Sequence, residues 1–486
     1  MKSGLKEQVA AGTGWTMGEK VATALFQFVV RILILRMLLP DDLKVIALLL
    51  AFSSVALVIV DSGFSQMLVR KQLPTEADYL AVFRFNLTAA LLLYGLLVLA
   101  APAVARWYAM PELARCAPLF FLMIPFNALC VIQQTLCTRT FRFALLSKAT
   151  FAAQVVSGTA AVALAWAGCG LWALVWQQVL LMATRAAILW CCSRWRPRRV
   201  GGTGPALRAM APYSASLLAT DLVTAFYNKV PQFFLGKLYP DATLGYYDQA
   251  VKLKELPVQS ALQSVQQVTF PALTRLSGDG PKFAESYRQI RGMTAYGIYP
   301  VMAGMAAVAH DFFAVLLGAK WMPTVPLFEV LCLAGIFTPS AMIAYNVLKA
   351  RAQGRTIVRL ELLKKAVMTL LLALSIPRSV EAVVWALVVS AAFDRLVNGV
   401  AALRLSGLSF WRLERTLLPV ALVTAAMYGA VRCVPLWLAE PSPGRLAAEI
   451  AVGATVYIGL SALLRLEPFR ELLALLRSWR SRTSRP

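Results

Sequence analysis

Apolar blocks of about 20 residues recur along the chain and alternate with short polar stretches. A helix of that length spans roughly 30 Å of hydrocarbon and satisfies its backbone hydrogen bonds internally, as lipid requires. The pattern therefore predicts an all-α integral membrane protein with about fourteen transmembrane helices. The expected spans are residues 12–38, 45–69, 79–101, 116–137, 146–167, 170–191, 209–235, 242–269, 290–312, 324–347, 357–376, 380–402, 416–434 and 447–464.

Composition favours the same class of protein. Of the 486 residues, 59% are hydrophobic, and the mean hydropathy is +0.66, whereas a soluble domain of this size needs far more polar surface. The polar N-terminal stretch MKSGLKEQVAAGTGW does not resemble a cleavable signal peptide. The eight cysteines have neither zinc nor disulfide spacing, and the single histidine, His310, has no partner motif. We therefore expect no metal, no cofactor and no catalytic residue.

The net charge of +24 raises the possibility of nucleic-acid binding, but the placement of the charges argues against it. Most basic residues fall on one set of alternate connections, which includes residues 194–208, 275–291, 349–365 and 404–415. Because basic connections stay cytoplasmic, we expect both termini on the cytoplasmic side of the membrane. The opposite side has only Lys44, Arg106, Arg115, Lys237, Lys320, Arg378 and Arg445.

Short sequence matches indicate an internal repeat. LLPDD at 38–42 recurs as LYPDA at 238–242, and WALV occurs at both 172–175 and 385–388. Each match has the same place in the order of spans, so we expect two pseudo-symmetric six-helix lobes around a central polar cavity. The predicted parts are an N-terminal lobe at 8–193, a basic linker at 194–206, a C-terminal lobe at 207–405, an extra helix pair at 413–466 and a basic tail at 467–486.

Several predicted spans carry polar stripes. In the segment GYYDQAVKLKELPVQSALQSVQQ, 245–267, six polar residues fall within about 80° of one helix face. A charge in hydrocarbon costs about 2.5–3.5 kcal/mol even on the lenient scale, so such residues face water or pair internally, as Asp248 with Lys252. The spans 12–38 and 209–235 carry similar stripes. Three stripes in two matching lobes favour an aqueous cavity over internal pairing alone.

Cationic residues predominate among these positions, which favours an anionic ligand, while glutamines suit the hydroxyl groups of sugars. The short outer connections offer no carboxylate or histidine cluster, so we do not expect an enzyme. The predicted substrate-binding residues are Lys20, Arg31, Arg84, Asp248, Lys252, Glu255, Gln259 and Gln263. The residues predicted to have a coupling or structural role are Glu19, Asp61, Asp221, Asn228 and Lys229.

An ordered set of segments resembles a known family. The segments are LLPDDLKVIALLLAF at 38–52, DSGFSQMLVRKQ at 61–72, TRTFRFALLSKATFAAQVVSG at 138–158, GCGLWALVWQQVL at 168–180 and LGYYDQAVKLKELPVQSALQSVQQVTFPALTRL at 244–276. They resemble the Wzx-like polysaccharide flippases of the multidrug/oligosaccharidyl-lipid/polysaccharide exporter superfamily, which include colanic-acid and teichuronic-acid exporters. The resemblance covers most of the chain to about residue 410, and the segment 244–276 is its most specific part.

The resemblance implies transport of undecaprenyl-diphosphate-linked oligosaccharide repeat units by alternating access, for O-antigen, capsule or exopolysaccharide synthesis. The expected partners are this lipid-linked oligosaccharide, the lipid bilayer and the polysaccharide polymerase or export machinery, with no nucleic acid. A monomer is expected, because two lobes suffice for an internal site. Two alternatives stay open: a drug or metabolite exporter of the same superfamily, and a lipid II flippase.

Overall fold

The computed structural model describes residues 23–474, except residues 24, 62, 72, 141, 194, 199–200, 240–241, 277, 352–353 and 439. The predicted site residues Glu19 and Lys20 lie outside the described residues. Gln259 and Gln263 belong to a described helix, but their side chains also lie outside the described part of the chain.

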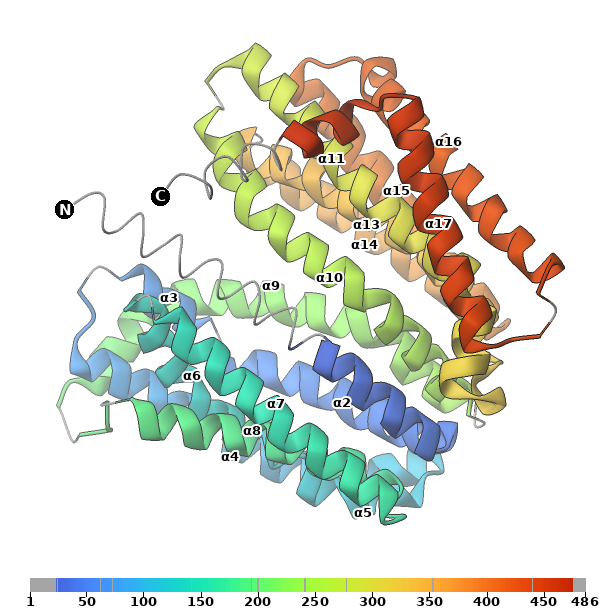
Figure 1. Ribbon diagram of the computed structural model, residues 1–486. Helices are drawn as coiled ribbons and strands as arrows, with labels where there is room; N and C mark the ends of the chain where they lie inside the picture. Colours follow the sequence, from blue (N-terminus) through green and yellow to red (C-terminus); the bar gives the residue numbers. More distant parts are fainter. Residues whose placement is uncertain are drawn as a thin grey trace, which may run out of the picture. The chain divides into compact units, whose positions relative to one another are not determined.

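The chain divides into two compact units, Met1–Gly245 and Tyr246–Pro486, and within the described residues both are helical (Figure 1). In the first unit, helical residues 25–37 precede α2 (Pro40–Asp61), α3 (Phe64–Arg70), α4 (Glu76–Tyr108), α5 (Pro111–Phe120), α6 (Met123–Arg139), α7 (Phe143–Trp166), α8 (Leu171–Cys192) and α9 (Thr203–Leu238). Helix α10 (Thr243–Arg275) begins at the end of this unit and continues into the second.

The rest of the second unit contains α11 (Gly280–Ala307), α12 (Ala309–Asp311), a π-helical turn (Phe312–Leu317), a 3₁₀ turn (Ala319–Trp321), α13 (Thr324–Arg351), α14 (Gly354–Ser375), α15 (Val380–Ser406), α16 (Phe410–Cys433), a 3₁₀ turn (Val434–Leu436) and α17 (Pro443–Leu463). The predicted lobe boundaries, 8–193 and 207–405, stay a prediction, because a compact unit is not the same thing as a sequence repeat.

Helix lengths agree with a protein that crosses a membrane many times. Among the described residues, eight helical segments are long and apolar enough to span a bilayer, or nine if the pair Gly280–Ala307 and Ala309–Leu317, bent by 59°, is one span. Helices α9, α10, α14 and α15 are also long, but each carries several charged residues. Each predicted span from 45–69 onward overlaps described helical residues, although 45–69, 116–137 and 290–312 each extend over more than one helix. The total of fourteen spans stays a prediction.

In the first unit, α7 packs along α8, and α2 packs along α9. A core cluster near one end combines Phe64, Leu68 and Tyr79 with the partly buried Trp190 and Trp195. The indole nitrogen of Trp190 donates a hydrogen bond of 2.9 Å to the Leu129 backbone oxygen. Aromatic side chains therefore join α3, α4 and α8. The hydrogen bond to Leu129 also satisfies the indole N–H of Trp190, which apolar contact alone would leave without a partner.

In the second unit, α13 packs along α15, and α11 contacts both α13 and α16. The final helices α16 and α17 form a pair that packs on α11 through Tyr296, Val420 and Tyr457. The hydroxyl of Tyr457 donates a hydrogen bond of 2.7 Å to the Tyr296 backbone oxygen. Helices α16 and α17 are thus packed into this unit, and the extra pair at 413–466 as a separate part stays a prediction.

Gly245 provides a test of the packing in the first unit. A Cβ atom at this position would collide with the backbone oxygen of Pro40 and lie 3.1 Å from its carbonyl carbon. We expect Gly245→Ala to destabilise the protein by about 1–3 kcal/mol, because only a backbone shift relieves the overlap. Thermal unfolding of the purified protein in detergent measures the effect.

The matched control is Gly297→Ala in α11, where a Cβ atom would meet nothing within 4 Å. This substitution is expected to be neutral or slightly stabilising, since alanine favours a helix by up to about 1 kcal/mol. Equal unfolding temperatures for the two variants would contradict the close approach between Gly245 and Pro40.

Candidate functional site

A polar cleft of about 670 Å³ opens within the first unit between α2, α3, α6 and α9. It brings together Asp61, Asp221 and Asn228, three residues that the sequence analysis had marked separately. The other polar residues of its wall are Ser65, Gln66, Gln134, Thr135, Thr138 and Thr224. The apolar part of the wall consists of small and branched residues such as Val58, Val69 and Val131.

Gly63 lies in the wall of this cleft, between the end of α2 and the start of α3. Its φ of 69° lies in the left-handed region, which glycine adopts at little cost. A Cβ atom here would lie 2.9 Å from the Leu217 Cβ and 3.0 Å from the Ser214 backbone oxygen, so α9 approaches the break closely. Because α2 ends at Asp61 and α3 begins at Phe64, both helices contribute polar residues to the same wall of the cleft.

Hydrogen-bond acceptors predominate in the cleft. Thr135, Thr138 and Thr224 each donate their hydroxyl hydrogen to the backbone oxygen four residues earlier, at 2.9 Å. Their remaining capacity is to accept, as it is for the carboxylates of Asp61 and Asp221. A ligand that donates several hydrogen bonds, such as a sugar or an organic cation, therefore matches this wall better than an anion does.

Asp61 also has neighbours outside the cleft wall. The side chain of Asn127 on α6 hydrogen-bonds its carboxyl group, and Arg185 on α8 attracts it electrostatically. The Nε atom of Arg185 is buried and has no hydrogen-bond partner in the described part of the chain. Asn127 and Arg185 thus orient the Asp61 carboxylate. Asp61 at the end of α2 and Asp221 on α9 are both exposed to solvent.

The remaining predicted residues of the first unit lie elsewhere. Arg84 is exposed on α4, Lys229 is half-buried on α9 next to Asn228, and Arg31 is half-buried in the helical residues 25–37. None of the three belongs to the cleft wall. The structure therefore brings Asp61, Asp221 and Asn228 together in the cleft wall, whereas the predicted cationic residues of this unit lie outside that wall.

On α10, Asp248 is only 3% exposed, and one of its carboxylate oxygens lies 2.6 Å from the Lys252 Nζ atom. This is the internal pair that the spacing of four residues allows as the alternative to a cavity. Glu255 is half-buried one turn further along the helix. A role of Asp248, Lys252 and Glu255 in substrate binding stays a prediction.

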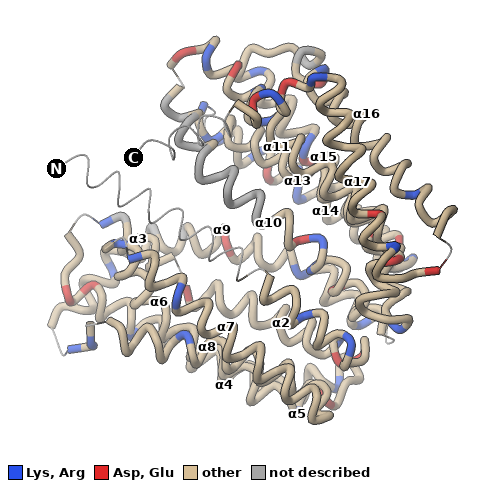
Figure 2. Tube along the Cα trace, in the orientation of Figure 1, with Lys and Arg blue, Asp and Glu red and all other residues tan. Residues whose placement is uncertain are grey.

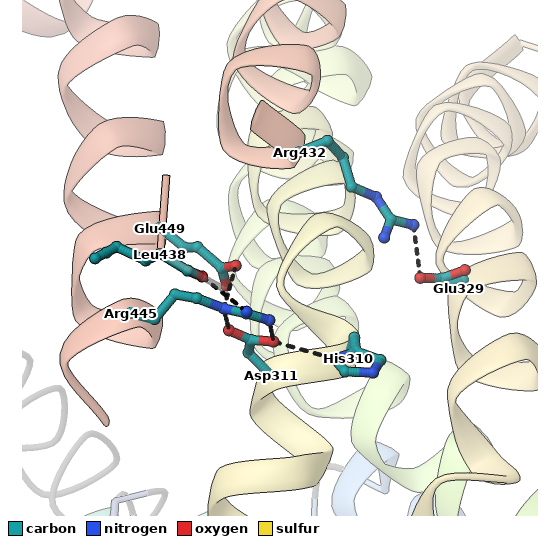
Figure 3. A network of polar contacts seen from close by, with 7 residues as sticks. All are labelled: His310, Asp311, Glu329, Arg432, Leu438, Arg445 and Glu449. Carbon is teal, nitrogen blue, oxygen red and sulfur yellow. Dashed lines mark hydrogen bonds and ion pairs between the residues drawn. The ribbon is translucent and has the colours of Figure 1, made fainter. Parts of the chain in front are cut away.

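A buried ion network joins α17 to the end of α11 and its continuation (Figure 3). The guanidinium group of Arg445 donates hydrogen bonds to both carboxylate oxygens of Asp311, and its Nε atom lies 3.8 Å from Glu449. Arg445, Asp311 and Glu449 are 4%, 2% and 2% exposed. Outside them, the exposed His310 lies 3.1 Å from Asp311, and Arg432 pairs with Glu329 at 2.7 Å.

The sequence pattern does not predict this network, because it places Arg445 among the connection charges that only set orientation. The structure begins α17 at Pro443, which places Arg445 inside the helix and buries it. Lys44 was counted in the same way, yet it lies in the first turns of α2 and is buried. The spacing of Arg445 and Glu449, four residues apart on one helix, was the available signal.

Comparison with known proteins identifies a family model and relatives that this chain resembles. A family model described as "Polysaccharide biosynthesis protein" matches residues 33–326. The chain is 27% identical over 388 residues to the succinoglycan biosynthesis transport protein ExoT of Rhizobium meliloti, covering 79% of this chain and 78% of that protein. It is 25% identical over 341 residues to the teichuronic acid biosynthesis protein TuaB of Bacillus subtilis, covering 68% and 69%. The resemblance of the segments to polysaccharide exporters is thereby confirmed.

Among solved structures, the lipid II flippase MurJ in its inward closed conformation has a similar fold, with a TM-score of 0.69. The match covers 93% of this chain and 100% of that one at 14% sequence identity, so it concerns the fold alone. It supports the all-α architecture that the apolar blocks predicted.

The ion network leads to a stability prediction. Arg445→Gln leaves the buried carboxylates of Asp311 and Glu449 without their guanidinium partner, which is expected to cost about 3–5 kcal/mol. Thermal unfolding in detergent measures this loss. Arg432→Gln is the control, because the Arg432 pair with Glu329 is partly exposed and such pairs contribute about 0–1 kcal/mol. A loss no greater than that of Arg432→Gln would refute a structural role for the network.

Proposed function

Because the chain belongs to the polysaccharide biosynthesis protein family, we propose that it moves undecaprenyl-diphosphate-linked oligosaccharide repeat units across the bacterial inner membrane. The chain is a multi-pass membrane protein of the flippase and exporter type. The product would be a surface polysaccharide: O-antigen, capsule or exopolysaccharide. The observation that carries the proposal is the acceptor-rich cleft around Asp61, Asp221 and Asn228, within a unit made of membrane-length helices.

The chemistry of such a substrate agrees with the cleft. Each sugar of the repeat unit presents several hydroxyl donors, and the wall offers carboxylate, amide and hydroxyl acceptors to receive them. The volume of about 670 Å³ lies within the range of roughly 300–1,000 Å³ found for small-molecule sites. We propose that part of the glycan occupies this cleft during transport.

The diphosphate needs cationic partners, and we assign that role to the basic residues of the predicted polar stripes. Arg31, Arg84 and Lys252 are the described candidates, and Lys20 is a further one. Transport would follow from alternating access. Binding of a coupling cation would then be a second role of Asp61, Asp221 and Asn228, while Lys229, which does not belong to the cleft wall, would have a structural role.

A second candidate function is the export of an organic cation, and the cleft itself supplies the argument for it. Two exposed carboxylates, those of Asp61 and Asp221, would attract a positively charged drug or metabolite. The family match and the transport protein ExoT favour the polysaccharide function over this one. The two functions differ in what a cell without the protein accumulates.

Lipid analysis of a deletion strain separates the two. The proposed function predicts that undecaprenyl-linked repeat units accumulate on the cytoplasmic leaflet while the surface polysaccharide disappears, and the mass of the accumulated lipid would identify the glycan. Unchanged surface polysaccharide together with increased sensitivity to cationic drugs would instead establish the exporter function.

The cleft predicts the effect of neutralising its acids. Asp61→Asn combined with Asp221→Asn removes two charged acceptors, each of which contributes about 1.5–3 kcal/mol to a hydrogen bond. We expect a deletion strain that expresses the double variant to make about tenfold less surface polysaccharide, or still less, than one that expresses the unaltered protein at the same level. Glu112→Gln, on an exposed part of α5 outside the cleft, should restore synthesis fully. Full restoration by the double variant would exclude the cleft as a binding site.

A further inference from the structure

Two cavities adjoin at one end of the second unit. The first is a groove of about 940 Å³ between α11, α13, α15 and α16, with a wall that includes Met302, Ile336, Leu417 and Ala421. The second, of about 1200 Å³, lies between the first turn of α11, the start of α16 and residues 464–468 after α17. Trp411 and Arg415 line both, so the two cavities meet at the first turns of α16.

The chemistry of the walls changes at this meeting point. Along the helices the groove is mostly apolar, apart from Glu329, which pairs with Arg432, whereas Arg395, Glu414 and Arg415 stand at its end. Beyond them, the second cavity is lined by Glu285, Arg288, Arg465 and Glu467. Figure 2 shows charged residues near the ends of many described helices and others within α9 and α10. Trp411, which is 79% exposed, marks the boundary, as tryptophan does at membrane interfaces.

The meeting point carries an excess of positive charge. A single carboxylate, that of Glu414, receives both Arg291 at 2.7 Å and Arg395 at 2.8 Å. The Nη1 atom of Arg291 and the Nε atom of Arg395 are buried without a hydrogen-bond partner in the described part of the chain. Arg415 adds a third guanidinium group beside them. Three arginines thus stand against one glutamate at the end of an apolar groove.

The acidic residues of the second cavity do not cancel this excess. Glu285 and Glu467 are both engaged by Arg288, at 2.8 Å and 2.6 Å. Glu471 is close enough to feel the charges of this group, and Arg465 contributes a further positive charge to the wall. These three acids stand beside two arginines, which leaves one net negative charge there. The group around Glu414 has two net positive charges, so the two groups together keep an excess of one positive charge.

We infer that the two cavities form a binding site for an anionic glycerophospholipid of the surrounding membrane. Its acyl chains would lie in the apolar groove, its phosphodiester would accept hydrogen bonds from Arg415, and the rest of its headgroup would extend into the second cavity. Forked donors of arginine suit a phosphate, and a groove of this length with exposed apolar side chains such as Leu418 admits a lipid from the side. The inference goes beyond the proposed transport and holds whichever substrate is moved.

This site is assigned to a bulk phospholipid because a single phosphodiester charge matches the charge excess, and because both cavities together offer room for two chains and a small headgroup. A lipid seated there would fill the groove that the α16 and α17 pair leaves beside α13 and α15. The consequence is that an anionic lipid stabilises the packing of the C-terminal helix pair.

The test is lipid binding to the purified full-length protein, measured by native mass spectrometry with added phosphatidylglycerol, phosphatidylcholine or a polyprenyl monophosphate. We expect phosphatidylglycerol to bind at least about tenfold more tightly than phosphatidylcholine. Arg415→Gln should remove most of that preference, because it deletes an exposed guanidinium group without disturbing the core. Ala421→Phe should weaken the binding of phosphatidylglycerol by filling the groove while leaving all charges in place.

Arg404→Gln is the matched control, since Arg404 is an exposed basic residue of α15 that lines neither cavity. Its binding should equal that of the unaltered protein. Equal binding of phosphatidylcholine, or an equal loss in Arg404→Gln, would overturn the inference. So would preferential binding of the polyprenyl monophosphate, which would assign the groove to an isoprenoid lipid, or displacement of phosphatidylglycerol by inorganic phosphate at millimolar concentration, which would reduce the site to a free-anion site.

Discussion

A charge inside a membrane-spanning helix needs a partner or water, and this requirement governs the polar interior of the protein. The Asp311 and Arg445 pair shows how it is met. Neither residue is exposed by more than a few percent, and each would be costly to bury alone. Paired through two hydrogen bonds, they connect α17 to the helical segment that follows α11, where apolar contact gives no directional preference.

The two units meet this requirement in different ways. In the second unit many charged residues form ion pairs: Asp248 pairs with Lys252, Glu414 with two arginines, and Asp311 with Arg445. In the first unit, Asp61 and Asp221 line an open cleft whose other polar groups also accept hydrogen bonds. An acceptor-rich surface in membrane-length helices is stable only if water or a ligand supplies the donors. That is the physical basis for placing the transport chemistry there.

The C-terminal helix pair illustrates how a membrane protein combines three kinds of contact. At one end, Arg445 anchors α17 through buried charge, and in its interior the Tyr457 hydroxyl reaches the Tyr296 backbone. At the other end of α16, Glu414 gathers Arg291 and Arg395 from neighbouring helices. Between these polar contacts the surface of α16 is left as an apolar groove. Polar anchors at the ends thus leave the middle of the pair free to contact lipid.

Local features of the sequence were enough to predict an all-α membrane protein, because apolar blocks of bilayer length and basic connections need no knowledge of tertiary contacts. The Asp248 and Lys252 pair was within reach for the same reason, since residues four apart share one helix face. That Asp61, Asp221 and Asn228 lie together could not be predicted from local features, although each was recognisable as a polar residue in apolar surroundings.

Those residues come from different helices, and nothing in their spacing says which helices are neighbours. The same holds for Asp311 and Arg445, which lie at the ends of segments far apart in the chain. It holds as well for Arg415, whose importance comes from two cavities that meet beside it. The sequence by itself determined the helices, their membrane character and the family. Only the tertiary structure decided which charges are closed in pairs and which face a cleft, because both depend on which helix faces meet.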